Sequence, residues 1–488
     1  MTLRKFLKHT LLSFLLLIAI GYGLLVGLIE FDRFSVKTFQ KKQNQSDQPA
    51  VESLSFHTKN PQQITLINSG LASLWKRIDL IRSAKKSIEM EYFIYNLDRS
   101  SRILNRELIL QAQKGIKVRI IVDYSKPVFQ LDPFVAAFLK QSGIEVRYYN
   151  TASMFNVFGV QHRSHRKLLI VDDQFVITGG RNVADEYFDL SENYNFLDTD
   201  ILIEGTSVAE IKKGFDFYWK SNLSDSAEKF QTAFSEEQLQ SVVEEIKKGD
   251  KDDAVLAEIS QIGKRKFQES FKATCNDFSY VTDFPGASVA HRKVYNQIII
   301  ESERALKEII VESPYFVLKT DGMEAIKNLV NRGVHFKVLT NSLQSTDAFY
   351  TVSAFFATMR SLVSLGLEVW GYSGGAFDSE LKSIKQSGRW GLHSKRAVID
   401  GETTLIGTYN IDPRSANLNS ELMVVCRNQK ELAEKVLLDI NSRFANSLPL
   451  VQKNCLNCWT HVFKGASFQS QLLFFVFIPV SSQFDFLL

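Results

Sequence analysis

The chain has 488 residues, of which 45% are hydrophobic and 23% charged, with 58 Lys and Arg against 54 Asp and Glu. This length suits two or three ordinary domains or one large bilobal domain. The composition excludes a disordered or collagen-like chain, and a net charge of +4 over the whole molecule does not indicate a strongly basic nucleic-acid binder. Four cysteines are too few for a disulfide framework in a chain of this size.

An uncharged apolar stretch lies near the N-terminus, from Thr10 to Ile29, after three basic residues. As a helix it is about 30 Å long, the thickness of the hydrocarbon core of a bilayer. The alternative is a cleaved signal peptide, since Ala19-Ile20-Gly21 is a weak cleavage site. Because the apolar stretch continues past that site, we favour an uncleaved anchor over residues 1–30 and a single-pass location in the cell (inner) membrane. Basic residues flank both ends, so the side of the membrane is not predicted.

Two further segments frame the body of the chain. Residues 31–55 are polar and Gln-rich and predict a tether. Residues 453–488 form an apolar, Phe-rich tail, and its run Leu472–Ile478 is too short to span a bilayer. A membrane-surface segment, a packed tail and a sequence irregularity all remain open for it. Cys455 and Cys458 form a lone CxxC, which does not by itself predict zinc because zinc needs further ligands.

The body repeats one pattern, first in residues 56–223 and again in residues 275–452. Each copy has an apolar strand, a helical run and an alternating basic and apolar strand, with Gly115 or Gly333 at the helix end. Strands that alternate with helices predict an α/β fold of parallel sheets covered by helices. Residues 224–274 are charged and helical, and we interpret them as a connector.

A motif of the form His-x-Lys-x4-Asp occurs in both copies, and an Asn follows each motif at the same spacing. A lone His on an apolar strand is usually structural, but two matched sets by chance are improbable. We therefore predict these residues as the site. They are His165, Lys167, Asp172 and Asn182 in the first copy and His393, Lys395, Asp400 and Asn410 in the second.

The spacing of the motif has a physical reason. Residues i and i+2 of a strand point the same way, so the His and the Lys share a face. Asp172 and Asp400 follow the strand at a hairpin turn, and we assign them a structural role because Asp side chains bind backbone N–H groups at turns. The return strand brings the Asn back to the His. Small residues after it allow close approach of the backbone, and we predict Gly180 and Thr408 as substrate-binding residues.

Two imidazoles, two ammonium groups and two amides around one point suit a phosphodiester. The lysines and asparagines would stabilise the phosphoryl oxygens. One neutral His would attack phosphorus to form a phosphohistidine, and the other would protonate the leaving alcohol; the sequence does not tell which is the nucleophile. A carboxylate should orient each imidazole. Glu421 is the candidate for His393, and Asp198, with Asp200 second, is the candidate for His165. His162 could join His165 in half of a metal site, but without a third ligand we predict no metal and no cofactor.

At these residues the chain resembles the phospholipase D superfamily, whose members carry paired HKD motifs. It is similar to bacterial cardiolipin synthases, particularly the type C group, over about residues 55 to 450. The resemblance implies two fused α-β-α sandwich halves related by a pseudo-two-fold axis, after an N-terminal transmembrane helix. The supporting stretches are 179–188, 215–219, 313–316, 339–347 and 410–421.

The resemblance also implies an activity: transfer of a phosphatidyl group from phosphatidylethanolamine or phosphatidylglycerol onto phosphatidylglycerol, giving cardiolipin. The expected partners are phospholipids and a membrane, not nucleic acid. A monomer suffices for one site, and the oligomeric state is not predicted. The alternatives are a phospholipase D that uses water as acceptor, a nuclease, against which the near-neutral charge and the anchor count, and a lipid-binding protein without turnover, against which both complete motif sets count.

Overall fold

A computed structural model describes residues 54–125, 131–152, 159–230, 252–286, 292–375, 380–384, 388–453 and 457–484, together with residues 237, 244 and 455. The predicted anchor at 1–30 and nearly all of the predicted tether lie outside the described residues. Within the part that is described, no helix combines the length and the apolar character that a membrane crossing requires.

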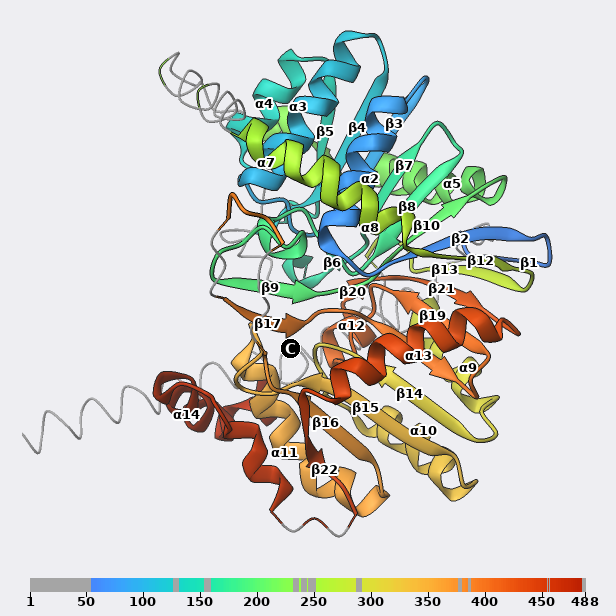
Figure 1. Ribbon diagram of the computed structural model, residues 1–488, viewed down its shortest axis with the longest axis vertical. Coiled ribbons are helices and arrows are strands. Elements are labelled where there is room, and N and C mark those ends of the chain that lie inside the picture. The colour runs from blue at the N-terminus through green and yellow to red at the C-terminus, as the bar shows by residue number, and fades with distance from the viewer. Residues whose placement is uncertain are drawn as a thin grey trace, which may run out of the picture.

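Two nine-stranded mixed sheets form the molecule, one in each half, and they are stacked one above the other in Figure 1. The strands of the first sheet, in spatial order, are β11 (Ser224–Ser226), β5 (Ile144–Tyr149), β4 (Lys117–Asp123), β3 (Ser87–Tyr92), β7 (Leu168–Val171), β8 (Phe175–Gly179), β10 (Asp200–Glu204), β2 (Gln62–Ile67) and β12 (Phe271–Cys275).

The second sheet repeats this order. Its strands are β22 (Ser447–Val451), β16 (Glu368–Tyr372), β15 (His335–Asn341), β14 (Glu308–Glu312), β18 (Arg396–Ile399), β19 (Thr403–Gly407), β21 (Leu422–Cys426), β13 (Phe278–Thr282) and β1 (Phe56–Thr58). Within these two sheets, parallel pairing is confined to β3–β4–β5 and β14–β15–β16, where helices connect the strands. The predicted parallel arrangement therefore holds for these strands, whereas the predicted motif hairpins make the neighbouring strands antiparallel and the sheets mixed.

Helices cover both sheets. In the first half they are α2 (Gly70–Ser83), α3 (Arg99–Gln113), α4 (Pro133–Gln141), α5 (Ser207–Lys220), α7 (Asp253–Glu258) and α8 (Lys264–Gln268). In the second half they are α9 (Lys293–Glu303), α10 (Thr320–Asn331), α11 (Phe349–Leu365), α12 (Pro413–Asn417), α13 (Lys430–Phe444) and α14 (Phe468–Phe484). Gly115 and Gly333 have positive φ after α3 and α10, as the helix-end prediction requires.

One apolar core runs through the seam between the halves. It combines side chains of both sheets with α5 and α13, whereas separate cores lie under the outer helices of each half. On β7, Leu168 and Ile170 enter the shared core and Leu169 and Val171 enter the outer core of the first half. This alternation explains why the motif strands are apolar on both faces.

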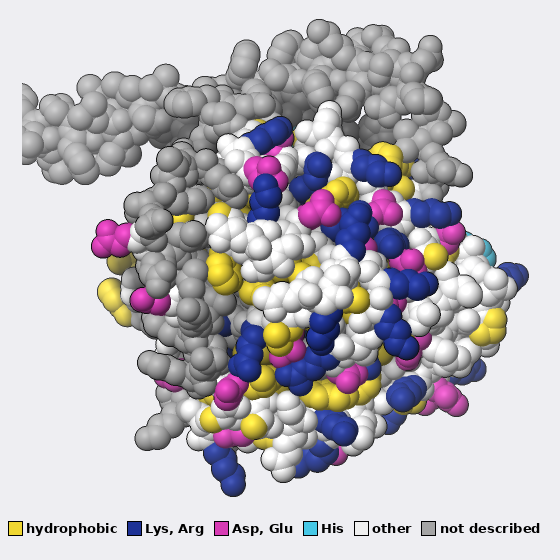
Figure 2. Space-filling view, turned by 90° about the horizontal axis from the view of Figure 1, so that it is seen from above, with side chains coloured by type: hydrophobic (Ala, Val, Ile, Leu, Met, Phe, Trp, Pro, Cys, Tyr) yellow, Lys and Arg dark blue, Asp and Glu magenta, His cyan; other side chains and the backbone are white. Residues whose placement is uncertain are grey.

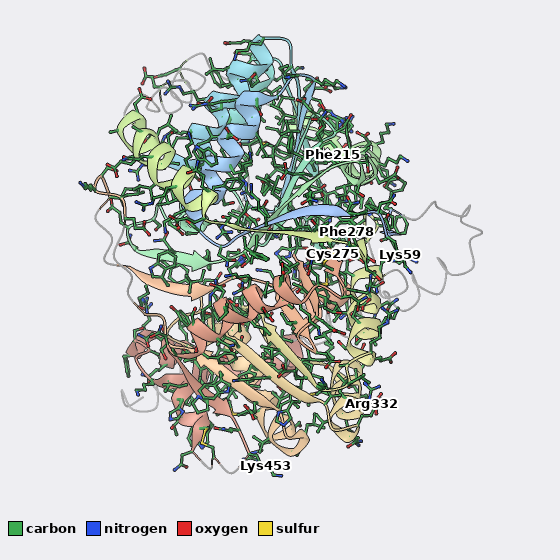
Figure 3. The ribbon with its side chains drawn as sticks, turned by 45° about the vertical axis from the view of Figure 1, so that its right-hand side comes forward. Lys59, Phe215, Cys275, Phe278, Arg332 and Lys453 are labelled. Atoms are coloured by element: carbon green, nitrogen blue, oxygen red, sulfur yellow. A yellow bond between two sulfur atoms is a disulfide. The ribbon has the colours of Figure 1, made fainter. Side chains whose placement is uncertain are left out.

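The halves also exchange chain segments. β1 lies at the start of the predicted first half but pairs with β13 of the second sheet. Within the predicted connector at 224–274, β11 and β12 extend the first sheet and α8 packs on α2. Cys275 lies at the seam (Figure 3) and is joined to Cys426 by a disulfide. The cysteines therefore contribute a covalent link between the two sheets, which the cysteine count alone did not predict.

Charged side chains of both signs are interspersed on the end of the molecule seen from above (Figure 2). This mixture agrees with a formal net charge of only +4. A face of this kind is typical of a solvated surface.

Candidate active site

Two short parallel strand pairs join the halves, and one strand of each pair directly precedes a motif His in the sequence. β6 (Arg163–Ser164) pairs with β20 (Asn419–Ser420), and β9 (Tyr194–Leu197) pairs with β17 (Arg389–Leu392). Figure 1 shows β9 directly above β17, between the two sheets. In each pair one strand comes from the first half and one from the second, so the residues that follow these strands meet across the seam.

This register decides which carboxylate each imidazole receives. Ser164 lies opposite Ser420, so the next residues, His165 and Glu421, are neighbours. Nδ1 of His165 is 2.9 Å from Oε2 of Glu421, and the backbone N–H of His165 donates to the carbonyl of Ser420. A carboxylate accepts from Nδ1–H in this geometry, which leaves Nε2 of His165 available for chemistry.

The second imidazole is held in the same way. Leu197 lies opposite Leu392, and the residues that follow are Asp198 and His393. Nδ1 of His393 is 2.6 Å from Oδ2 of Asp198. Both carboxylates were predicted, but each was assigned to the His of its own half, and this pairing was wrong. The physical reason is that the parallel strand pairs form between the halves and not within them.

Asp200, the second candidate for His165, has a different role. It accepts from Ser73 Oγ at 2.6 Å and from Nη1 of Arg77 at 3.0 Å, and all three side chains are buried. Arg181 lies 3.5 Å from it and donates to the main-chain carbonyl of Asp198. These contacts fix the start of β10 and the backbone of Asp198, so Asp200 supports the site without touching His165.

Polar side chains of the second half surround Glu421. Its oxygens accept from Thr408 Oγ1 at 2.5 Å, from Ser415 Oγ at 2.8 Å and from Nδ2 of Asn419 at 3.3 Å. Burial nevertheless raises the pKa of Glu421 to about 7, while Lys167 and these hydrogen bonds act in the opposite direction.

The pKa of Asp198 is shifted in the opposite direction from that of Glu421. Burial acts to raise its pKa, but His393, Lys395 and Arg181 outweigh burial and hold the pKa of Asp198 below its usual range. One carboxylate of the site is thus firmly ionised and the other retains a proton to near-neutral pH. The two imidazoles therefore have similar geometry and different electrostatic support.

The two lysines lie beside their histidines. Nζ of Lys167 donates to the carbonyl of His165 at 2.7 Å, and Nζ of Lys395 donates to the carbonyl of His393. Burial lowers the pKa of Lys395 to about 8 and holds that of Lys167 well below its usual value. Burial and the lysines also lower the pKa of both imidazoles, so both are neutral in the empty site at neutral pH.

The motif aspartates lie at the far ends of their strands. The carboxylate of Asp172 accepts from the backbone N–H groups of residues 85, 86 and 87, at 2.7, 2.7 and 3.0 Å. Asp400 accepts from residues 306, 307 and 308 at 2.7, 2.8 and 2.9 Å. Both have positive φ, at 55° and 52°. Their structural role is as predicted, although the N–H groups that they bind belong to the segments entering β3 and β14 and not to their own turns.

The remaining predicted residues are buried, and two of them, Gly180 and Thr408, lie against the site carboxylates. Oδ1 of Asn182 accepts from the N–H of Ile94 at 3.1 Å, and Asn410 is 5% exposed. A Cβ on Gly180 would lie 2.1 Å from Oδ1 of Asp198, so only glycine fits behind that carboxylate. Thr408 is fully buried as a donor to Glu421. Contact of Gly180 and Thr408 with substrate stays a prediction.

Aromatic rings that the sequence analysis missed lie against the imidazoles. Phe93 is 5.3 Å from His165, and Tyr187 and Phe196 are 5.0 and 4.8 Å from His393, between ring centroids. Such rings limit the orientations of an imidazole and exclude water from it. Arg181 and Ser415 were also missed. Arg181 directly precedes Asn182, and Ser415 lies between Asn410 and Glu421; these positions were the available signal.

The CxxC pair does not present free thiols, because Cys455 and Cys458 form a disulfide. Among the residues that the structure describes, no three His, Cys, Asp or Glu side chains are grouped so that they could hold a metal ion.

Comparison with known families identifies the architecture. The family model described as "Cardiolipin synthase, PLD-like domain" matches residues 78–219 and 298–444, one segment in each half. The chain belongs to the phospholipase D superfamily. With its two motif sets in one chain, it is a phosphatidyltransferase of that superfamily, similar to the cardiolipin synthases.

Individual relatives of this superfamily member span most of the chain. It is 32% identical over 413 residues to an uncharacterized protein of Helicobacter pylori strain J99, covering 79% of this chain and 80% of the relative. It is 24% identical over 396 residues to Cardiolipin synthase C of Escherichia coli K12, covering 76% and 83%. Among solved structures, phosphatidylserine synthase of Haemophilus influenzae shares the fold, with a TM-score of 0.62 at 16% identity over 88% of this chain and 98% of that one.

Proposed function

We propose that the enzyme transfers a phosphatidyl group from phosphatidylethanolamine or phosphatidylglycerol onto phosphatidylglycerol, giving cardiolipin through a phosphohistidine. The observation that carries this proposal is the crossed pairing of His165 with Glu421 and of His393 with Asp198. Each Nδ1 is engaged by a carboxylate, so both Nε2 atoms are available for one phosphodiester between the halves. The match to the cardiolipin synthase family supports the choice of substrates.

In the first step, Nε2 of one histidine attacks phosphorus and the bond from phosphorus to the headgroup oxygen breaks. The other imidazole donates its proton to that oxygen, and the headgroup alcohol leaves. In the second step this imidazole takes a proton from the hydroxyl of phosphatidylglycerol, which attacks the phosphohistidine and releases the first histidine. The lysine ammonium groups offset the charge on the phosphoryl oxygens in both steps.

Binding of the substrate prepares the acid. In the empty site burial, and after it the charge of the two lysines, holds the pKa of both imidazoles down. A phosphodiester anion between the lysines offsets that repulsion and favours a protonated imidazole. The partly buried ring of Phe93 and the buried rings of Tyr187 and Phe196 favour a lipid alcohol over water as acceptor, because they exclude solvent from the phosphohistidine.

The proposal includes a location and an assembly. We infer that the enzyme works at the cell membrane, attached by a single span over Thr10–Ile29, because both substrates reside in a bilayer. One chain contains both motif sets, so a monomer suffices for one site.

Product analysis tests the proposal. Purified full-length enzyme is incubated with phosphatidylethanolamine and phosphatidylglycerol of different acyl composition, with and without excess EDTA, and the lipids are identified by mass spectrometry. We expect cardiolipin whose acyl chains report the donor, in both samples. Phosphatidic acid as the main product would identify a hydrolase, and activity that EDTA removes and a metal restores would contradict the metal-free mechanism.

A further inference from the structure

The C-terminal helix α14 has no charged residue over its 17 positions. One face of it is packed: Phe474 is fully buried, Ile478 is partly buried against the core of the second half, and Ser481 is 2% exposed. These residues are spaced i, i+4 and i+7, as expected for one face of a helix. The sequence analysis left the role of this tail open. The structure shows that one face of α14 packs on the second half.

The opposite face of α14 is apolar and open to solvent. Phe468, Leu472, Phe475 and Val476 are 82, 53, 57 and 58% exposed. Their spacing of i, i+4, i+7 and i+8 forms one continuous row, here named the α14 stripe. Contiguous exposed apolar side chains in a soluble body mark a surface that binds a partner or a membrane.

Contacts with α11 and with Phe463 fix the orientation of α14, so the α14 stripe is a defined part of the protein surface. The ring of Phe474 contacts Phe356 of α11 at 5.3 Å and Phe463 at 5.0 Å, between centroids. Phe477 contacts Phe349 at 5.2 Å, and Ser353 Oγ donates to the carbonyl of Phe474 at 3.3 Å. These contacts fix which face of α14 points outward.

The same contacts connect α14 to the active site. α11 begins at Phe349, two positions after Asp347, which accepts from Tyr315 Oη at 3.0 Å. Burial raises the pKa of Asp347, and Lys395 of the site lies close enough to oppose that rise. α14 therefore packs against the end of α11 that lies beside the site.

Few charged residues flank α14 in the sequence. Lys464 is exposed four positions before its first residue, and Asp485 follows its last residue. Trp459, in the segment that precedes α14, is 45% exposed and contacts Phe356 of α11. Lys and Trp beside an apolar helix face are typical of the interface between a bilayer and water, and Lys suits anionic headgroups.

We propose that the α14 stripe docks on the surface of a lipid bilayer and places the active site against the headgroups. The inference rests on the proposed function. A phospholipid that left its bilayer would expose acyl chains at about 0.8 kcal/mol per CH₂ group, so the site must come to the interface. The α14 stripe is an apolar surface on a helix that packs beside the site. Its docking would hold the site at the bilayer independently of the N-terminal segment.

A fluorescent probe tests the docking itself. The full-length protein carries an environment-sensitive dye at Phe475→Cys, or at Leu438→Cys on α13 as a matched control that is 61% exposed. Both proteins are reconstituted into vesicles of phosphatidylethanolamine and phosphatidylglycerol that contain a lipid-borne quencher. We expect roughly threefold stronger quenching at position 475 than at position 438. Equal quenching would overturn the proposal, and so would shielding of the dye at 475 by a second copy of the chain without lipid.

An activity comparison tests the consequence. The double variant Phe475→Glu/Val476→Glu should lose about tenfold of its turnover on long-chain lipids in vesicles and stay within about twofold of the parent on short-chain lipids dissolved below their critical micelle concentration. Leu438→Glu should change neither. Equal loss on both substrates would overturn the docking role, as would no loss on vesicles. If the parent turns over neither substrate, the proposed function fails, and the dye alone decides the docking.

Discussion

His165 and Glu421 lie 256 positions apart in the chain and 2.9 Å apart in the structure. The equivalent pair, His393 and Asp198, is 195 positions apart in the chain. Because each half supplies the imidazole of one pair and the carboxylate of the other, neither half holds a complete set. The active site is thus a property of the fused pair of halves, and the shared core between the sheets keeps the two sets in register.

The crossed carboxylates should be essential for turnover. We predict that Glu421→Gln and Asp198→Asn each lower kcat by about 10² to 10⁴, because each imidazole loses its orientation and the support for its positive charge. Steady-state kinetics on mixed micelles measures the loss. In imidazole ¹H–¹⁵N spectra, Glu421→Gln should shift the signals of His165 and leave those of His393 in place. If Glu421→Gln shifted the signals of His393 and left those of His165 in place, each carboxylate would orient the His of its own half, and the crossed pairing would be contradicted.

The same two variants should have opposite effects on stability at pH 8. The pKa of Glu421 is raised in the folded state, so above pH 7 its charge is disfavoured, and Glu421→Gln should raise the free energy of unfolding. The pKa of Asp198 is lowered, so its charge stabilises the fold, and Asp198→Asn should destabilise it. Changes of about 1–3 kcal/mol are expected in each direction. Thermal melts at pH 8 that shift the same way for both variants would refute this electrostatic contrast.

Lys395 should set an alkaline limit on activity. Burial lowers its pKa to about 8, so the ammonium group loses its proton as the pH rises through 8 and no longer offsets phosphoryl charge. We therefore expect kcat/KM to fall above pH 8. Lys395→Arg keeps the charge and should remove this fall between pH 8 and 9, at a lower plateau. A decline at the same pH in both enzymes would assign the limit to another group.

The motif aspartates should act on stability and not on chemistry. Asp400 holds three backbone N–H groups at the entrance to β14. Replacing it with Ala should lower the free energy of unfolding by about 2 kcal/mol, with kcat per folded molecule within about threefold of the parent. Denaturant melts and active-site titration measure the two effects separately. A large loss of kcat in a stably folded Asp400→Ala protein would give this carboxylate a chemical role.

Much of the site was predictable because the duplicated motif fixes its spacing within each strand and hairpin. The predicted residues are the ones that meet, but His165 and Lys167 lie in the segment between β6 and β7 and not on a strand, and their counterparts lie between β17 and β18. Asp172 lies at its turn, as predicted. The pairing of Glu421 was not predictable from local pattern, because it depends on β6 and β20, which are two residues each. Strands that short leave no periodic signal in a sequence.

The fold shows the same limit. Helices α3 and α10 and their terminal glycines followed from local sequence. The exchange of β1 and β12 between sheets did not, since each strand pairs with segments far away in the chain. The disulfide between Cys275 and Cys426 was likewise hidden, because the two cysteines become neighbours only when both sheets form.

The central claim, one covalent centre shared by two histidines, is tested most directly by trapping the intermediate. Enzyme turning over phosphatidylethanolamine is quenched in milliseconds and digested, and its peptides are analysed by mass spectrometry for a phosphatidyl group on histidine. We predict one adduct per chain, on either His165 or His393, and none when the modified residue is replaced with Ala. Adducts on both histidines of one chain, or full turnover with no adduct on either, would contradict the account.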